Sequence, residues 1–146
     1  MGTLVSVSLR IPYKKLPDGK GGFVYCAMLP INIALPSKNA PRSKRFEAII
    51  DSGATRCMFH AQIGQAIGLD IEKGQKETTL GIAGETDTYR HDVSLYVPGG
   101  IIAVRAGFSN RLSVAGVLGL MDFFANFKIT FDPTALCCEL ERLYQA

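Results

Sequence analysis

The chain has 146 residues, of which 47% are hydrophobic and 20% are charged, and its net charge is +3. These values are typical of one globular domain that is long enough to bury a core without metals or disulfides. The weak positive charge and the absence of tryptophan do not favour a nucleic-acid surface. The four cysteines lack the spacing of metal ligands, so we expect free thiols in a reducing cytoplasm.

The N-terminus has no charged-then-apolar signal peptide, and no apolar run reaches the ~18 residues that a membrane span needs. Residues 1–6, Met-Gly-Thr-Leu-Val-Ser, match the loose pattern for N-myristoylation. A pattern this short recurs by accident, so the prediction is a cytoplasmic protein without a membrane span.

The first third of the chain predicts strands and exposed loops. Residues 4–11 alternate between apolar and polar side chains, as a half-buried strand does. Residues 12–22 are rich in proline, glycine and lysine and predict a loop or the end of a hairpin. The stretch 23–35 is apolar and interrupted by Pro30, which predicts one or two strands. Residues 36–45 predict a polar, basic and mobile loop at the surface.

A buried strand is predicted at 46–50, directly before Asp51. Small residues follow it at 52–55, where the backbone of another molecule could come close. A carboxylate at the end of a buried strand is costly unless it is paired, hydrogen-bonded or functional. Taken by itself, Asp51 is more simply a turn residue that bonds its own backbone.

A short helix is predicted at 60–67. Phe59, Ile63 and Ile67 lie four residues apart and would share one face, and Gly68 suits the end of the helix.

The second half of the chain predicts further strands. Residues 78–80 and 89–97 are β-prone, and Gly81-Ile82-Ala83-Gly84 between them suits a mobile hairpin loop. Other predicted elements are strands at 101–108, 127–131 and 136–143, a small apolar run at 114–119 and a short helix at 121–127. About nine strands with regular turns predict an all-β barrel or sandwich. Strands and helices do not alternate, which excludes a doubly wound sheet.

Residues 49–55, Ile-Ile-Asp-Ser-Gly-Ala-Thr, resemble the active-site segment of retropepsin-like aspartic proteases. Gly81-Ile82-Ala83-Gly84 lies where that family has its flap hairpin, and Val117-Leu118-Gly119 resembles the segment that braces the active-site loop. Residues 122–124 and 128–132 resemble the short helix and closing strand of single-domain members.

The resemblance spans residues 46–132 and implies one domain over 1–146. Residues 1–45 would add N-terminal strands and the basic loop, and 133–146 a C-terminal strand. The implied fold is a closed β-barrel with a flap and one or two short helices. The implied activity is that of an aspartic endopeptidase, with an extended peptide as its substrate and with no cofactor or metal.

Only one Asp-Ser-Gly occurs in the chain, whereas aspartic protease chemistry needs two carboxylates that share one proton. The resemblance therefore implies a homodimer in which the two copies of Asp51 meet on a two-fold axis. By the same resemblance, Ser52 would lock the two loops together across the axis, and Thr55 would support the same loop. Gly53 would let the substrate approach, and Ala54 would line the pocket floor.

The sequence departs from the viral pattern at two places. Viral members often carry an acidic residue after the active-site turn and an arginine after the bracing glycine, and this pair supports their dimer. Here those regions hold Thr55-Arg56 and Leu120-Met121. Both members of the pair are replaced, so neither is left as an unpaired charge, and a different mode of dimer support is expected.

Three other interpretations compete with a peptidase. Fold does not imply function, so the chain could be a non-catalytic module that binds peptide or only dimerises. A serine or cysteine hydrolase using Ser52 or Cys57 with His60 would lack the Gly-x-Ser-x-Gly elbow. A metal site built from His60, His91 and a cysteine lacks ligand spacing.

Overall fold

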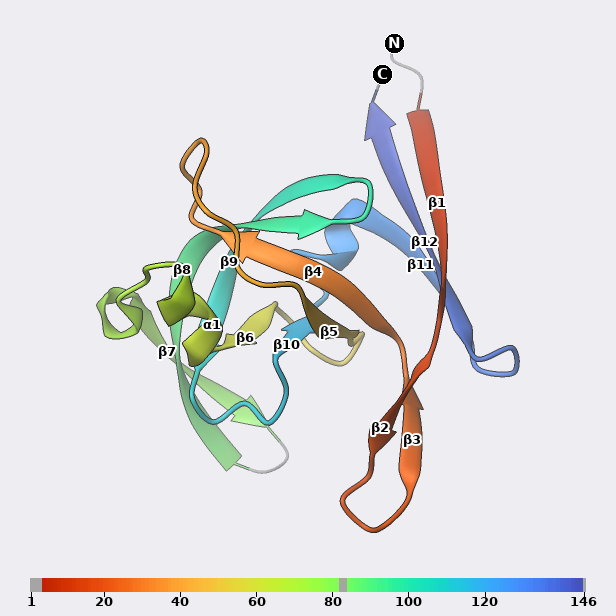
Figure 1. Ribbon diagram of the computed structural model, residues 1–146, viewed down its shortest axis with the longest axis horizontal. Coiled ribbons are helices and arrows are strands. Elements are labelled where there is room, and N and C mark those ends of the chain that lie inside the picture. Colours follow the sequence, from red (N-terminus) through yellow and green to blue (C-terminus); the bar gives the residue numbers. More distant parts are fainter. Residues whose placement is uncertain (1–3, 82–83, 146) are drawn as a thin grey trace.

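The computed structural model describes residues 4–81 and 84–145, and Figure 1 shows its arrangement. Within these ranges the elements, in chain order, are β1 (Leu4–Pro12), β2 (Lys14–Pro17), β3 (Phe23–Cys26), β4 (Met28–Ala34), β5 (Phe46–Ile50), β6 (Met58–His60), α1 (Ala61–Ala66), the 3-10 turn η1 (Ile71–Lys73), β7 (Gln75–Gly81), β8 (Gly84–Val97), β9 (Gly100–Ser109), β10 (Gly116–Leu118), the 3-10 turn η2 (Phe124–Asn126), β11 (Phe127–Asp132) and β12 (Cys137–Gln145). In this part of the chain no helix is long and apolar enough to cross a membrane.

The centre of the molecule is a closed barrel of six strands. Their order is β4-β5-β10-β6-β9-β8, and the ring closes because β8 pairs with β4 as well as with β9. The pairs β5–β10 and β6–β9 are parallel, whereas the other pairs are antiparallel. Closure removes the exposed edges that an open sheet would present, so the barrel is a rigid base for the loops attached to it.

The barrel interior is filled by apolar side chains that alternate along the strands. Leu29, Ile31 and Ile33 of β4 are at most 1% exposed, because every second residue of the strand faces inward. Phe59 and Phe108 are both fully buried, and their ring centroids lie 5.9 Å apart. This core holds β5 and β10 in place, and Asp51 follows directly after β5.

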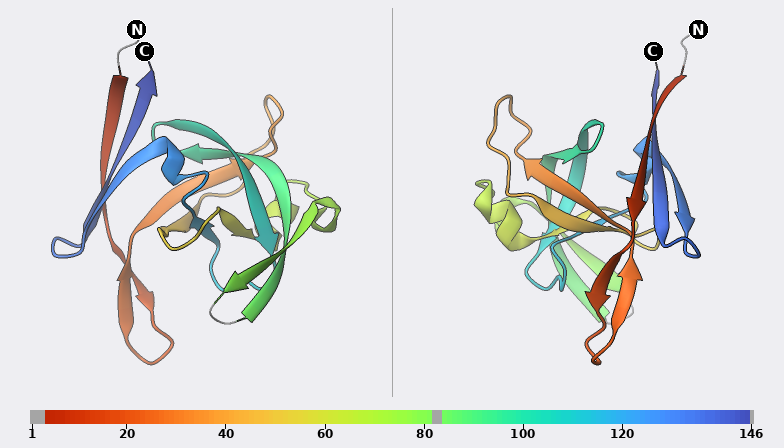
Figure 2. Two further views of the ribbon diagram at one scale, coloured as in Figure 1. Left: turned by 180° about the vertical axis from the view of Figure 1, so that it is seen from behind. Right: turned by 45° about the vertical axis from the view of Figure 1, so that its right-hand side comes forward.

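Smaller sheets and hairpins lie outside the barrel. The sheet β1-β12-β11 contains the first and last strands, and among the described residues β2 pairs only with β3, in a separate two-stranded sheet. Figures 1 and 2 show the β2–β3 hairpin and the β7–β8 hairpin extending from the body in the same direction, away from the chain ends.

The predicted fold class and several elements are confirmed. The structure is mostly β with a closed barrel, and β5 has the predicted bounds. The predicted helix at 60–67 is α1, with His60 as its N-cap and Ile67 as its C-cap. Gly68 follows with φ of +99°, a conformation that favours glycine at a helix end.

Other predictions were wrong. A helix at 121–127 does not form, and only the short turn η2 does, because Phe127 pairs with Arg142 of β12 and the Asp122 carboxylate is bonded to Cys57. Of the two alternatives for 12–22, a plain loop is wrong and the end of a hairpin is right, because β2 pairs with β3 and residues 18–22 join them. The strands β7 and β8 also begin earlier than predicted, at Gln75 and Gly84.

Candidate active site

Main-chain hydrogen bonds on both sides fix the backbone that leads into Asp51. Ile50 pairs with Leu118 of β10, and the N–H of Asp51 donates to the carbonyl of Leu118 at 3.0 Å. On the opposite side, the N–H of Ile50 donates to the carbonyl of Ala27 at 2.9 Å. A strand held by two neighbours cannot shift in register, so the position of Asp51 is set by the barrel.

The carboxylate of Asp51 is half-buried, and its two oxygens differ. Oδ1 accepts the N–H of Gly53 at 2.8 Å, and the carbonyl of Asp51 accepts the N–H of Ala54 at 3.2 Å. The turn contact expected from the sequence is therefore present, and it orients the carboxylate. Oδ2 makes no hydrogen bond to any residue in the described ranges, which leaves it open for another partner.

The segment after β10 holds the active-site loop from the other side. The N–H of Leu120 donates to the carbonyl of Ala54 at 2.9 Å, and the N–H of Met121 to that of Thr55 at 2.8 Å. These bonds continue the β5–β10 pairing into the loop. The segment Val117-Leu118-Gly119 therefore lies directly against residues 49–55.

Gly119 lies so close to the loop that no side chain fits there. A Cβ at this position would stand 2.5 Å from the carbonyl carbon of Arg56 and 2.7 Å from its nitrogen. Backbone atoms cannot turn away as the end of a flexible side chain can. A glycine is thus required for the bracing segment to approach the loop.

A cleft of about 570 Å³ opens beside Asp51, within the size range of ligand pockets. Gly53 and Ala54 line it from the loop, and Glu77 and Arg90 line it from the β7–β8 hairpin. Arg90 is 6% exposed, because its Nη1 lies 3.3 Å from Glu77 Oε2 and its Nη2 donates to the carbonyl of Arg105 at 2.6 Å. The hairpin side of the cleft is therefore polar, with its buried cation paired.

A solved structure has a similar overall fold. The crystal structure of a retropepsin-like aspartic protease from Rickettsia conorii matches with a TM-score of 0.61 at 17% identity, and the match covers 99% of this chain and 97% of that one. The chain has a retropepsin-like fold. The solution structure of simian foamy virus (mac) protease matches with a TM-score of 0.42 at 18% identity, covering 65% of this chain and 89% of that one. The sequence matches no protein-family model and no curated protein.

The predicted flap loop lies at the end of the β7–β8 hairpin. Gly81 of β7 pairs with Gly84 of β8, so the two glycines of the predicted loop close the hairpin. Ile82 and Ala83, which complete that predicted loop, lie outside the described residues.

Asp122 is a supporting residue that the sequence did not reveal. Its carboxylate accepts the N–H of Cys57 at 3.0 and 3.1 Å, and the thiol of Cys57 lies 3.0 Å from Oδ1. Burial, and then the charge and hydrogen bond of Asp122, raise the pKa of the Cys57 thiol. The thiol therefore stays protonated and donates a hydrogen bond to Asp122 Oδ1. This contact ties the end of the active-site loop to the turn that follows the bracing segment. The sequence offers one sign of this role: Asp122 is the one charged residue in the otherwise apolar stretch 114–124.

The residues of the competing hydrolase interpretation have other roles here. His60 Nδ1 accepts the N–H of Gln62 as the cap of α1, and the Cys57 thiol faces Asp122. Ser52 and Thr55 are exposed on the active-site loop. Among the residues that the structure describes, no three His, Cys, Asp or Glu side chains gather where they could hold a metal ion.

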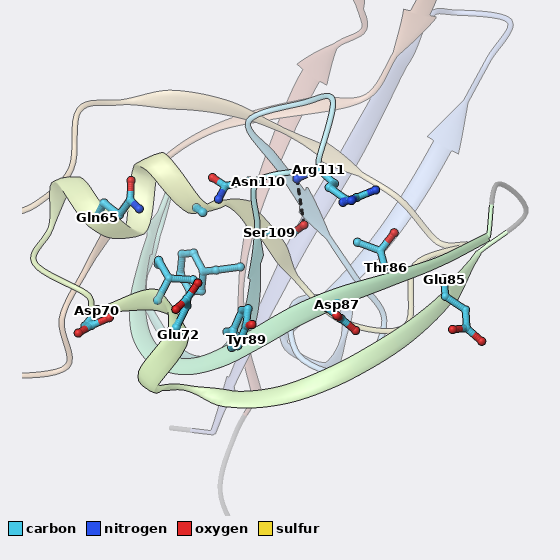
Figure 3. Close-up of a pocket in the computed structure, with 13 residues that line it drawn as sticks. Gln65, Asp70, Glu72, Glu85, Thr86, Asp87, Tyr89, Ser109, Asn110 and Arg111 are labelled. Atoms are coloured by element: carbon cyan, nitrogen blue, oxygen red, sulfur yellow. Dashed lines mark hydrogen bonds between the residues drawn. The ribbon is translucent and has the colours of Figure 1, made fainter.

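A second hollow of about 500 Å³ lies between α1, the turn after β9 and the face of β8 that carries Asp87 and Tyr89 (Figure 3). It shares no lining residue with the cleft beside Asp51. Glu85 and Asp87 are on its rim, and the N–H of Arg111 donates to Ser109 Oγ at 3.0 Å. Its carboxylates therefore belong to a surface separate from the candidate active site.

Proposed function

We propose that this chain is an aspartic endopeptidase that acts as a homodimer. The observation that supports this most is the carboxylate of Asp51, with one oxygen held by Gly53 and the other open beside a cleft of about 570 Å³. Each chain supplies one such carboxylate, and the chemistry needs two. A second copy related by a two-fold axis would supply the other.

In the proposed dimer the two carboxylates of Asp51 share one proton, because like charges so close together cannot both stay ionised. The ionised carboxylate takes a proton from water as the water attacks the peptide carbonyl. The protonated carboxylate donates its proton to the carbonyl oxygen. Such positioned proton transfer contributes ~10²–10⁴ in rate, and no covalent intermediate is needed.

The rest of the loop would shape the site. Ser52 would bond to the partner's loop across the axis, Gly53 would admit the substrate backbone and Ala54 would form the floor. Thr55 would hold the loop against the residues that follow the bracing segment, because its carbonyl accepts the N–H of Met121.

The β7–β8 hairpin would act as the flap that closes over an extended peptide and excludes water. Most of the recognition would come from strand-like bonding to the peptide backbone, with side-chain pockets adding specificity.

The direct test is incubation of the purified protein with a mixed peptide library, beside Asp51→Ala, at about pH 4 to 7. We expect cleavage that increases below neutral pH, since the pair must hold one proton, and no cleavage by the variant. Full activity of the purified variant would refute the role of Asp51. A dimer that binds peptides but cuts none would instead identify a non-catalytic module.

A further inference from the structure

The β2–β3 hairpin has one exposed face. Within residues 4–81 and 84–145 its two strands pair only with each other, and a lone two-stranded hairpin is at best marginally stable in water. In this register Lys15 faces Tyr25 and Pro17 faces Phe23, so these four side chains share one face of the hairpin. We call these four residues the aromatic face.

The two rings of the aromatic face are unusually exposed. Phe23 is 63% exposed and Tyr25 48%, and the ammonium of Lys15 lies 5.3 and 5.8 Å from the two ring centroids. On the opposite face, Lys14 forms an ion pair with Glu47 of β5, whereas Val24 is 46% exposed. At the Lys14 end of the hairpin, the aromatic face is therefore the one directed away from the barrel.

The open end of the hairpin, where β3 leads into β4, lies next to the candidate active site. Directly after β3, the carbonyl of Ala27 accepts the N–H of Ile50, the residue before Asp51. From this point the hairpin extends in the same direction as the β7–β8 hairpin (Figures 1 and 2). In a dimer whose axis passes between two copies of Asp51, it would extend along the boundary between the subunits.

Residues 52–55 of the active-site loop are Ser-Gly-Ala-Thr and offer little apolar area to a dimer. The apolar side chains bonded next to them are Leu120 and Met121, which are 44% and 62% exposed. A half-exposed aromatic ring adds about 100 Å² when it becomes covered, so the four rings of a symmetric dimer add roughly 400 Å². A standard interface buries roughly 1,600 Å² in total. The aromatic face would thus supply a substantial share of the area that the loop lacks.

We propose that the aromatic face packs against a second copy of this chain and holds the two halves of the active site together. This inference rests on the proposed homodimer. A two-fold axis would repeat the contact, with each hairpin packed on the other subunit. An apolar contact of this kind would replace the acid–arginine pair that the sequence lacks.

The test uses the full chain carrying Asp51→Asn, so that dimerisation is measured without reference to catalysis. Sedimentation equilibrium would give the dissociation constant of the dimer with and without the double change Phe23→Ser, Tyr25→Ser. We expect a rise of about thirtyfold or more, as for the loss of central aromatic anchors. Ile101→Ser, which removes an apolar side chain that is 54% exposed on β9, is the matched control and should leave the constant unchanged.

A second variant separates weak dimerisation from faulty folding. Phe23→Leu with Tyr25→Phe keeps an apolar face and should restore most of the affinity. In chains that keep Asp51, the protein concentration that gives half-maximal cleavage should rise by the same factor as the dissociation constant, with kcat unchanged at saturating protein.

Three results would overturn the inference. The serine variant could dimerise as tightly as Ile101→Ser, or it could raise KM alone, which would assign the hairpin to substrate instead of a second copy. A chain that stays monomeric at all concentrations would also overturn it. The first two results leave the peptidase proposal intact, whereas absence of cleavage in a tight dimer would refute only the peptidase.

Discussion

Replacement of Asp122 by alanine should loosen the active-site loop without touching the proposed catalytic group. The N–H of Cys57 has Asp122 as its acceptor, and Cys57 is fully buried, so the change leaves a buried donor unpaired. The N–H of Phe123 keeps a second acceptor, the carbonyl of Gly119 at 3.1 Å, and adds little. An unpaired buried N–H and the lost thiol contact together predict a loss of about 2–4 kcal/mol in the free energy of unfolding.

The assay is thermal unfolding at a fixed protein concentration, since dimerisation makes Tm depend on concentration. For a chain of this size, a loss of that magnitude lowers Tm by roughly 4–16 °C. Asp122→Asn keeps one acceptor oxygen and should lose less. Asp92→Ala removes an exposed carboxylate that is paired with Arg105, and it should change stability by at most about 1 kcal/mol.

Activity gives a second measure of the same contact. Because Cys57 ends the loop that carries Asp51, Asp122→Ala should also lower kcat/KM at temperatures where the protein is still folded. Unchanged Tm and unchanged kcat/KM in Asp122→Ala would refute the claim that this carboxylate holds the loop.

Two further predictions concern packing and pH. Gly119→Ala should lower the free energy of unfolding, measured by urea denaturation, by about 1–3 kcal/mol, because its Cβ would meet the backbone of Arg56. Gly107→Ala is the control: its Cβ would lie 3.4 Å from the nearest atom, so the free energy of unfolding should hardly change. Equal stability of the two variants would contradict the steric argument. Burial raises the pKa of Cys57 above its ordinary 9.0 and that of Cys138 to about 11, so the folded chain keeps protons that the unfolded chain loses. The free energy of unfolding should therefore fall as pH rises above about 9, by up to about 1.4 kcal/mol per pH unit for each thiol. In Cys57→Ala this fall should be shallower. An equal slope in the variant and the wild type would exclude Cys57 as its source.

The parts of the fold that the sequence predicts well are those set by local patterns. In the strand 46–50, which lies between two barrel strands, Ala48 and Ile50 are buried. The helix α1 forms within the predicted range, but Phe59 lies in β6 and the buried residues of the helix are Ala61 and Gly64. The segment 121–127 has a similar apolar pattern, but Asp122 accepts the N–H of Cys57 and Phe127 pairs with Arg142 of β12. Local pattern therefore fails where contacts to a distant part of the chain decide the backbone.

In the candidate site, too, the local features could be predicted and the long-range contacts could not. Asp51 and its small neighbours are adjacent in sequence, so the motif and its turn could be predicted together. The contact between Cys57 and Asp122 joins residues 65 positions apart, and no spacing rule connects them. The closure of the barrel by β4 and β8 is equally non-local. The exposed rings of β3 could not be predicted either, because a β-prone stretch usually buries one face.

The central claim is that one active site needs Asp51 from two chains, and subunit mixing tests it most directly. Wild-type protein would be mixed with increasing amounts of Asp51→Asn under conditions that allow exchange, and cleavage of a peptide substrate would be followed. If only wild-type homodimers are active, a ninefold excess of the variant should reduce the activity to about a tenth by mass action. Activity that stays constant as the variant is added, in a mixture shown to have exchanged subunits, would mean that one chain carries a complete site and would contradict the claim.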